Sequence, residues 1–338
     1  MPARNSEAET SVSQGRLIWR RFLSNKLAVT SAVLFILIVL FAISSVGLGP
    51  IPGWWKFSYS QLNDQVNQGN PTLSLWPFSI GDHPFGQDRI GRDYFAMTMR
   101  GVQNSTLVMI VLGGIAAILG VVVGALSGYY RGWIDSVLMR ITDVFIVIPA
   151  LVIGSVVGNW AGNLGDFFLS LMLGFVSWMG IARLVRGEFL TLRERPFVEA
   201  ARVAGASDRR IIFKHILPNA MGVVIVSSTP IMATAILLET ALSFLGYGIK
   251  APEVSLGGLV SANEPAFQTR PWLFWWPASF IVGMALLVNF VGDGLRDAFD
   301  PRHKVFRIRK IRERPEDLMS DGATSEPEAG LGVLGRST

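Results

Sequence analysis

Long apolar stretches alternate with polar segments along this chain of 338 residues. The first runs from 27 to 48 without a charged residue, which matches the ~20 apolar residues that a helix needs to cross a bilayer. Five further stretches of spanning length follow, at about 104–128, 138–159, 166–185, 219–243 and 272–294. The pattern predicts an all-α integral membrane protein with six transmembrane helices.

The polar segments divide the chain into parts with different predicted surroundings. These parts are a cytoplasmic tail and interfacial helix (1–26), the first transmembrane helix (27–48), an extracytoplasmic loop (49–103), a five-helix transmembrane core with a cytoplasmic loop at 186–218 (104–295), and a basic juxtamembrane segment with a disordered tail (296–338). The interfacial helix is predicted from the basic, amphipathic pattern around Arg16 to Phe22. The disorder follows from the acidic, Gly-, Ser- and Pro-rich composition of the last residues.

The positive charges indicate how the chain is oriented in the membrane. With both termini on the cytoplasmic side, 24 of the 30 Lys and Arg residues fall in inner segments and six in outer ones. This orientation is favoured because cytoplasmic segments carry an excess of Lys and Arg. It places the loop at 186–218 in the cytoplasm.

Composition supports a membrane protein and excludes other classes. Half of the residues are hydrophobic and 16% are charged, unlike an average soluble domain. The basic balance alone would also suit nucleic-acid binding, but the Lys and Arg residues border apolar stretches. We therefore expect a lipid bilayer as partner and no nucleic acid. The absence of cysteine excludes disulfides, thiolate metal sites and cysteine-linked lipids.

One cytoplasmic stretch, Pro196–Pro218, has a pattern of its own. Pro196 suits the first position of a helix. One face of that helix would be small and apolar, formed by Phe197, Ala200, Ala201 and Ala204. Gly205 suits the left-handed position that ends a helix, and Ser207 suits the N-cap of a second helix that stops at Pro218. We expect a helix, a glycine elbow and a second helix at the membrane surface.

The same stretch resembles the EAA loop of permease subunits in bacterial ATP-binding-cassette importers. The resemblance rests on Glu199-Ala200-Ala201, Gly205 and Leu217-Pro218, while His215 stands where an isoleucine is common. In that family the loop forms a coupling helix that docks in a groove of the ATPase subunit. The resemblance therefore implies an ATPase-coupling role for Glu199, Ala200, Ala201, Gly205, Ile216, Leu217 and Pro218. The alternative is an amphipathic connector without a partner.

Further motifs resemble one subfamily, the C-type permease of dipeptide and oligopeptide importers. They follow one another in family order over residues 80–302: His83-Pro84-Phe85-Gly86-Gln87-Asp88, Gly91-Arg92-Asp93, Gly128-Tyr129-Tyr130, Leu138-Met139-Arg140, Glu239-Thr240-Ala241-Leu242-Ser243-Phe244-Leu245-Gly246, and Gly292-Asp293-Gly294-Leu295-Arg296-Asp297. Gln87 stands where threonine is usual. The resemblance implies the type I importer permease fold.

The outer motif provides candidates for a turn and a docking surface. These candidates are His83, Gly86, Asp88, Gly91, Arg92 and Asp93. A metal site is not expected there, because no other histidine falls on that side of the membrane. Within the spans, Gly120, Gly124 and Gly128 share a four-residue spacing that favours close packing of helices.

Several residues inside the spans are unusual for a membrane interior. Pro149 and Pro230 should kink or break their helices, either as hinges of a transport pathway or as simple packing bends. Arg183 should extend its charge to the membrane surface. Asp143 and Glu239 are further candidates for the transport pathway, because carboxylates inside spans tend to be functional. Asp143 has Arg140 as a plausible mate one turn away. Glu239 has no local partner, so we expect it near the interface or paired across a subunit contact.

The sequence lacks motifs for nucleotide binding and for catalysis. No Gly-Lys dipeptide occurs, so the chain has no phosphate-binding P-loop, and no hydrolase or zinc-protease constellation is found. We expect a non-enzymatic chain without a cofactor, with ATP and Mg bound by partners. The resemblance implies a second homologous permease, two ATPase subunits and an extracytoplasmic solute-binding protein, in a bacterial or archaeal plasma membrane.

We expect an ATP-driven importer of di- or oligopeptides. The same machinery for nickel, glutathione or an oligosaccharide is the alternative within this class. The alternative from another class is a self-sufficient secondary transporter. Against it stand the lack of an inverted repeat and the lack of a chain of buried charges through the membrane.

Overall fold

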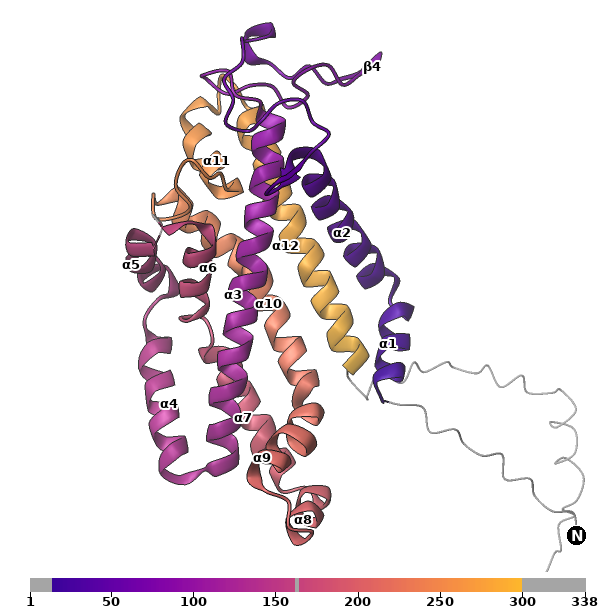
Figure 1. Cartoon of the computed structure of the whole chain (residues 1–338), viewed down its shortest axis with the longest axis vertical. Helices are drawn as coiled ribbons and strands as arrows, with labels where there is room; N and C mark the ends of the chain where they lie inside the picture. The colour runs from indigo at the N-terminus through magenta and orange to yellow at the C-terminus, as the bar shows by residue number, and fades with distance from the viewer. Residues whose placement is uncertain (1–13, 162–163, 300–338) are drawn as a thin grey trace, which may run out of the picture. The chain divides into compact units, whose positions relative to one another are not determined.

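Four long helices dominate the computed structural model, which describes residues 14–161 and 164–299. Within these residues, the helices long and apolar enough to cross a membrane are α2 (Lys26–Val46), α3 (Tyr94–Tyr130), the helical run Asp208–Phe244, which ends in α10 (Leu217–Phe244), and α12 (Trp272–Phe299). They run alongside one another in Figure 1. The expected polar start of the chain and its basic and acidic tail lie outside the described residues.

Two bent pairs of helices provide the remaining spans. They are α4 (Gly132–Val147) with α5 (Ala150–Ala161), bent by 86°, and α6 (Asp166–Gly174) with α7 (Met179–Arg193), bent by 43°. Counting each pair as one span gives up to six in the described residues. The helical membrane-protein fold expected from the apolar pattern is confirmed, with four short strands outside the spans in the part of the chain that the structure describes.

The two prolines inside spans have different effects. Pro149 separates α4 from α5, because the residue before a proline avoids helical geometry, and Ile148 is extended (φ −77°, ψ 125°). Pro230 lies inside α10, which remains continuous, so the break that its sequence allows does not occur. It removes only one backbone donor. Hydroxyl groups on the turn before it donate to carbonyl oxygens of the same helix, for example Thr229 Oγ1 to Ile225 O at 3.0 Å.

Helix α3 begins at Tyr94, well before the expected 104. Asp93 caps it by accepting a hydrogen bond from the Ala96 N–H at 2.8 Å. The polar residues of its first turns have distant partners: Arg100 makes an ion pair with Glu253, and Gln103 donates to the carbonyl oxygens of Ala42 and Gly47. A segment that appears aqueous in the sequence is therefore helical and enclosed by protein.

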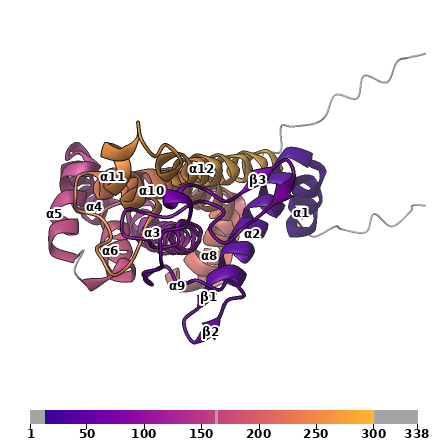
Figure 2. The same ribbon diagram turned by 90° about the horizontal axis from the view of Figure 1, so that it is seen from above.

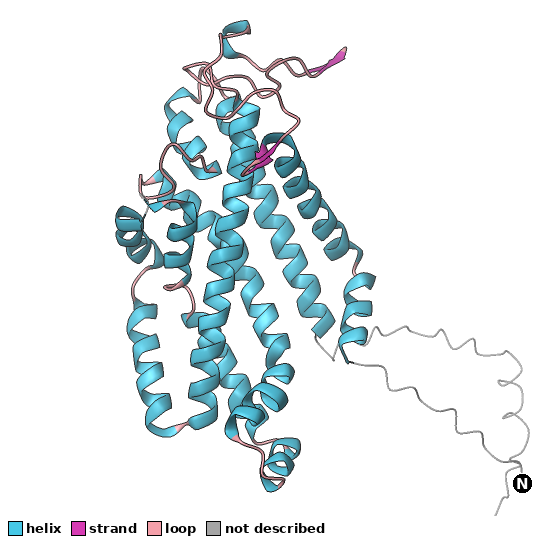
Figure 3. Cartoon of the chain, in the orientation of Figure 1, coloured by secondary structure: helices cyan, strands magenta, loops and turns pink. Residues whose placement is uncertain are grey.

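Short elements occupy the two ends of the helices. At the end formed by residues 47–93, two antiparallel hairpins pair β1 (Gly47–Leu48) with β2 (Ile51–Pro52) and β3 (Ser74–Leu75) with β4 (Phe78–Ser79), as Figure 3 shows. The same end of the molecule also holds three short helical elements: the turn Asn67–Gly69, α11 (Leu256–Asn263) and the turn Glu264–Ala266. At the opposite end lie α8 (Pro196–Val203), α9 (Asp208–Arg210) and a π-helical segment (Ile211–Ile216).

Helix α1 (Gln14–Ser24) has the predicted amphipathic character. Phe22 is buried and Ile18 is partly buried, and both belong to a small apolar cluster with Ala298 of α12. Trp19 and Leu23 are exposed. Its position on the cytoplasmic leaflet stays a prediction.

Three glycines of α3 bring it into backbone contact with α7. A Cβ on Gly120 would lie 2.6 Å from Ile181 Cβ, one on Gly124 would lie 2.5 Å from Ala182 O, and one on Gly128 would lie 2.7 Å from Phe189 Cβ. The predicted packing role of this spacing is confirmed. Seen from above in Figure 2, α3 lies between α4–α6 on one side and α2 on the other.

Replacing Gly124 with alanine tests this contact. The methyl group would meet the backbone of α7, so the two helices must separate, at a cost of about 1–3 kcal/mol. We expect the melting temperature of the detergent-solubilised chain, followed by size-exclusion chromatography after heating, to fall by ~2–10 °C.

Gly114→Ala is the matched control on the same helix, because nothing lies within 4 Å of its added Cβ. This variant should melt like the parent chain or slightly higher, since alanine favours a helix over glycine. Equal melting temperatures for the two variants would contradict the packing assignment.

Candidate functional sites at the two ends of the helices

The segment Pro196–Pro218 begins as the sequence predicts. Pro196 is at the start of α8, after an extended Arg195. The helix ends in two hydrogen bonds, from Gly205 N to Arg202 O at 2.9 Å and from Ala206 N to Ala201 O at 3.0 Å. With Gly205 at φ +79°, these bonds form a Schellman motif, which needs a left-handed residue at this position. The glycine elbow is therefore confirmed.

The second half of the segment differs from the expected helix that stops at Pro218. The chain passes from α9 through the π-helical segment directly into α10, and Pro218 lies in the first turn of α10. The Leu217 N–H donates to Ile212 O, five residues back. Pro218 follows this change of register, where a missing N–H costs little. Ser207 has the backbone of an N-cap, but its side chain makes no capping hydrogen bond.

The residues of the EAA-like motif fall into two groups. Glu199, Ala200 and Gly205 are exposed, and Ala201 is half-buried. Ile216 is fully buried and Leu217 half-buried, so these two belong to the interior rather than to an outward surface.

The expected small apolar face of α8 is mostly exposed. Phe197, Ala200 and Ala204 lie open, and beside them Val203 is 86% exposed. Val198, on the opposite side, is fully buried and holds the helix against the rest of the chain in a cluster that includes Ile212. Helix α8 therefore presents an apolar surface that the described part of the chain leaves uncovered.

The charged residues of the third and fourth spans are paired with each other. Arg183 Nη2 lies 2.5 Å from Asp143 Oδ1, so the mate of Asp143 is Arg183 of α7 and not Arg140. Arg183 is thus neutralised across the helix pair instead of only extending to the surface. Two turns away from Asp143, Asp135 makes a bidentate pair with Arg186 at 2.6 Å for both bonds. The sequence alone did not single out this second pair, because its members are 51 residues apart.

Glu239 is fully buried within the described chain, between α10 and α11. Its Oε1 accepts a hydrogen bond from Ser243 Oγ at 2.6 Å, and Ser243 lies 3.2 Å from Ser255, the N-cap of α11. Its Oε2 has no hydrogen-bond partner among the described residues. Pairing across a subunit contact does not fit this burial, which is within the chain itself; a position of Glu239 near the membrane interface stays a prediction.

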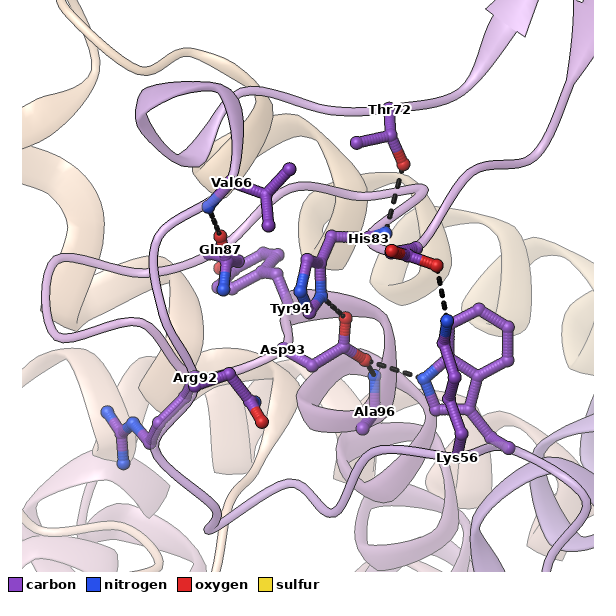
Figure 4. Close-up of polar contacts among 12 residues, drawn as sticks. Lys56, Val66, Thr72, His83, Gln87, Arg92, Asp93, Tyr94 and Ala96 are labelled. Atoms are coloured by element: carbon purple, nitrogen blue, oxygen red, sulfur yellow. Dashed lines mark hydrogen bonds and ion pairs between the residues drawn. The ribbon is translucent and has the colours of Figure 1, made fainter.

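At the other end, the outer motif folds inward and fixes the loop to α3. His83 Nδ1 lies 2.7 Å from Asp93 Oδ1, and Trp55 Nε1 donates to Asp93 Oδ2 at 2.8 Å (Figure 4). His83 is 2% exposed and Asp93 is fully buried. Burial raises the pKa of the Asp93 carboxyl, although the hydrogen bonds from His83, the Ala96 N–H and Trp55 pull it downward.

The other motif residues shape the turns of this loop. Asp88 Oδ1 accepts from the Arg92 N–H at 2.8 Å, and Asp88 Oδ2 lies 2.7 Å from Arg92 Nε. Gly86 and Gly91 have positive φ angles of 81° and 88°. Gln87 accepts from the Val66 N–H at 2.8 Å, drawn in Figure 4, so it ties two turns of the loop together.

A docking surface made by these side chains does not fit their burial. Of the six candidates, Arg92 alone is half-exposed, while the other five are buried. The motif therefore stabilises the fold of the loop through buried side chains. No cluster of three metal-ligating side chains occurs among the described residues.

Comparison with known proteins places the chain in a family. Residues 120–305 match the family described as binding-protein-dependent transport system inner membrane component, and residues 13–71 match the N-terminal TM domain of oligopeptide transport permease C. The first match alone covers more than half of the chain, and the two together leave residues 1–12, 72–119 and 306–338 unmatched.

Curated relatives match along nearly their whole length. The oligopeptide transport system permease protein OppC of Mycobacterium tuberculosis is 38% identical over 296 residues, which is 87% of this chain and 97% of the relative. The OppC proteins of Bacillus subtilis and Escherichia coli are each 35% identical, covering 89% of this chain and 95% and 98% of the relatives.

A solved structure has the same fold. A chain of the inward-facing MetNI methionine transporter of the ATP-binding-cassette class superposes with a TM-score of 0.50 at 21% identity, covering 60% of this chain and 96% of that chain. At this identity the likeness concerns the fold alone.

The buried carboxyl of Asp93 gives the outer loop a pH dependence. Because its pKa in the folded chain is raised above 3.8, folding takes up a proton between that value and the raised one. The contribution of Asp93 to stability is complete at low pH and is lost as pH rises through this window. We therefore expect the melting temperature of the parent chain, relative to that of Asp93→Asn, to fall as the pH is raised from about 4 through the raised pKa of Asp93.

Asp82 provides the control, because its exposed ion pair with Lys56 lowers its pKa and moves its window below 3.8. The difference in melting temperature between the parent chain and Asp82→Asn should not change with pH over the same range. A flat or rising difference for Asp93→Asn would show that the carboxyl is not held in a costly buried state.

Proposed function

This chain belongs to the family of binding-protein-dependent transport system inner membrane components, as an oligopeptide-type permease of an ATP-binding-cassette importer, and on this premise we propose how it works. It is a multi-pass inner membrane protein and a non-enzymatic component, in a family of permease subunits without cofactors. Such a component works with partner ATPase and permease subunits. In our proposal the chain conducts oligopeptides and receives the energy of ATP through the Pro196–Pro218 segment.

The observation that carries the coupling proposal is the uncovered surface of α8. An apolar helix face with Val203 86% exposed is costly to leave in water, so it suits burial against another subunit. The chain has no P-loop of its own, so ATP and Mg are bound by that other subunit. We assign this partner as the ATPase.

The proposed orientation has both termini and α8 in the cytoplasm. It is supported by the excess of Lys and Arg in the segments on that side. The loop at 47–93 then faces outward, where an extracytoplasmic solute-binding protein delivers its ligand.

The proposed substrate is an oligopeptide. The support is that the relatives matched over almost their full length are oligopeptide permeases. Nickel, glutathione and oligosaccharides remain the competing substrates of the same machinery. A self-sufficient secondary transporter is set aside, because the family consists of binding-protein-dependent components.

The proposed assembly has this chain, a second homologous permease, two ATPase subunits and the binding protein. ATP closes the ATPase pair, which displaces α8, and the spans change from inward- to outward-facing so that the peptide passes between the two permeases. Such a change needs an ATPase contact whose affinity differs between the two states, typically by about 1–3 kcal/mol. Pro149, between α4 and α5, and Pro230 stay candidates for hinges in this movement.

The proposal gives three residues of the motif, in and just after α8, a role. Glu199 is exposed and provides a polar anchor for the ATPase, and Ala201 allows close approach. Gly205 provides the bend, because a side chain at φ +79° is strained by roughly 1–2 kcal/mol.

Gly205→Val tests the coupling role. No atom lies within 4 Å of the added Cβ, so only the backbone conformation is disturbed. We expect normal membrane insertion, while peptide uptake in proteoliposomes falls at least about tenfold relative to ATP hydrolysis.

Gly205→Asn is the matched control, since asparagine adopts the left-handed conformation more readily than valine. It should retain most of the uptake. Normal uptake in Gly205→Val would remove the elbow from the coupling mechanism.

The assembly and substrate are tested by isolating the tagged chain from native membranes in mild detergent and identifying its companions by mass spectrometry. The proposal expects a second permease, ATPase subunits and a binding protein that retains a peptide. Isolation of the chain alone, active in liposomes without ATP, would contradict it.

A further inference from the structure

Tyr129, in the last turn of α3, contacts several parts of the segment around the elbow at once. Its side chain is 4% exposed. Its hydroxyl donates to Asp208 Oδ1 at 2.6 Å, and its backbone carbonyl accepts from Arg193 Nη1. The guanidinium carbons of Arg193 and Arg202 lie 5.7 and 6.0 Å from the centre of its ring.

These partners come from three different elements. Arg193 ends α7, Arg202 belongs to α8 before the glycine elbow, and Asp208 begins α9 after it. The ring also belongs to an apolar cluster with Val198 of α8 and Ile211 of the π-helical segment. Tyr129 is therefore a point at which both sides of the elbow are attached to α3.

The contacts are of a kind that transmits displacement. A hydroxyl bonded to a carboxylate is stronger than a neutral hydrogen bond and depends on direction. A cation facing an aromatic ring adds attraction on another side of the same residue. Because the attachments lie on both sides of the elbow, α8 and α9 cannot shift together without moving Tyr129 or breaking these contacts.

Helix α3 is rigidly joined to α7 just before this point. Next to Tyr129, Gly128 leaves no space for a Cβ against Phe189 and the Arg186 carbonyl. A force on Tyr129 therefore acts on the α3–α7 pair as a unit, along the longest helix of the described chain.

On these contacts we infer that Tyr129 is the positioning residue through which displacement of the Pro196–Pro218 segment is passed to α3. The inference rests on the proposed coupling function, since it concerns the path from the ATPase contact to the spans. Tyr129 acts through its contacts with Asp208, Arg193 and Arg202.

The test uses the complete importer in proteoliposomes, with uptake and ATP hydrolysis measured on the same samples. Tyr129→Phe keeps the ring and removes only the hydroxyl. We expect it to assemble normally and to lower the number of peptides imported per ATP by about fivefold or more. Tyr130→Phe is the control on the neighbouring, 44% exposed tyrosine, and should leave this ratio unchanged.

A double-mutant cycle with Asp208 identifies the contact responsible. Asp208→Ala should lower the ratio as Tyr129→Phe does, and the double variant should be no worse than either single variant. Asp208→Asn keeps an acceptor oxygen for the hydroxyl and should restore part of the ratio. Additive losses in the double variant would overturn the role of this hydrogen bond.

A purely structural role of Tyr129 would give a different experimental result. If Tyr129→Phe lowers the amount of assembled complex while the peptide-to-ATP ratio of the complex that remains is unchanged, the inference is wrong. Gly205→Val separates this failure from that of the proposed function. If Gly205→Val uncouples and Tyr129→Phe does not, the path through Tyr129 is wrong; if neither uncouples, the coupling function itself is wrong.

Discussion

The backbone contact between α3 and α7 is the constraint on which the rest of the structure depends. At Gly120, Gly124 and Gly128 the two helices approach so closely that even a methyl group would collide with the other chain segment. In a bilayer, where lipid is as apolar as the helices, such close packing replaces the hydrophobic effect as the force between spans. Since α7 leads directly into α8, this contact also sets the position of the Pro196–Pro218 segment.

The structure satisfies polar groups inside the apolar bundle by pairing them across helices. Asp143 and Asp135 of α4 each make an ion pair with an arginine of α7. Helix α4 therefore contacts α7 through ion pairs, whereas α3 contacts α7 through close backbone packing. At the end of α3 near the 47–93 loop, Arg100 makes an ion pair with Glu253. Glu239 is the exception, with one oxygen unpaired among the described residues. The Asp143–Arg183 pair is about half exposed and the other two are partly exposed, so each adds only modestly to stability, and the pairs specify which helices lie next to one another.

Much of the fold follows from local patterns, whereas the pairings do not. The apolar stretches predict the spans, Pro149 predicts a helix break, and Gly205 predicts the elbow, because each depends on residues close in sequence. The polar first turns of α3, the mate of Asp143 and the surroundings of Glu239 involve contacts between residues that are 12 to 153 positions apart in the sequence. The sequence predicts a docking surface at the outer motif, whereas the mutual hydrogen bond of His83 and Asp93 allows both side chains to be buried. The predicted helix end at Pro218 is wrong, because a π-helical turn leaves no signature in the sequence.

In the proposed mechanism, α8 docks on an ATPase subunit in the cytoplasm. The chain contains no cysteine, so Val203→Cys introduces a single, exposed thiol on α8. The most direct measurement attaches a maleimide–benzophenone to this thiol in inside-out membrane vesicles that contain the whole importer, followed by irradiation and mass spectrometry. If α8 docks on the ATPase subunit, we expect an adduct with that subunit, and its yield should change when ATP is added. A thiol that reacts with an impermeant reagent only from the extracytoplasmic side, or an adduct confined to lipid, would contradict it.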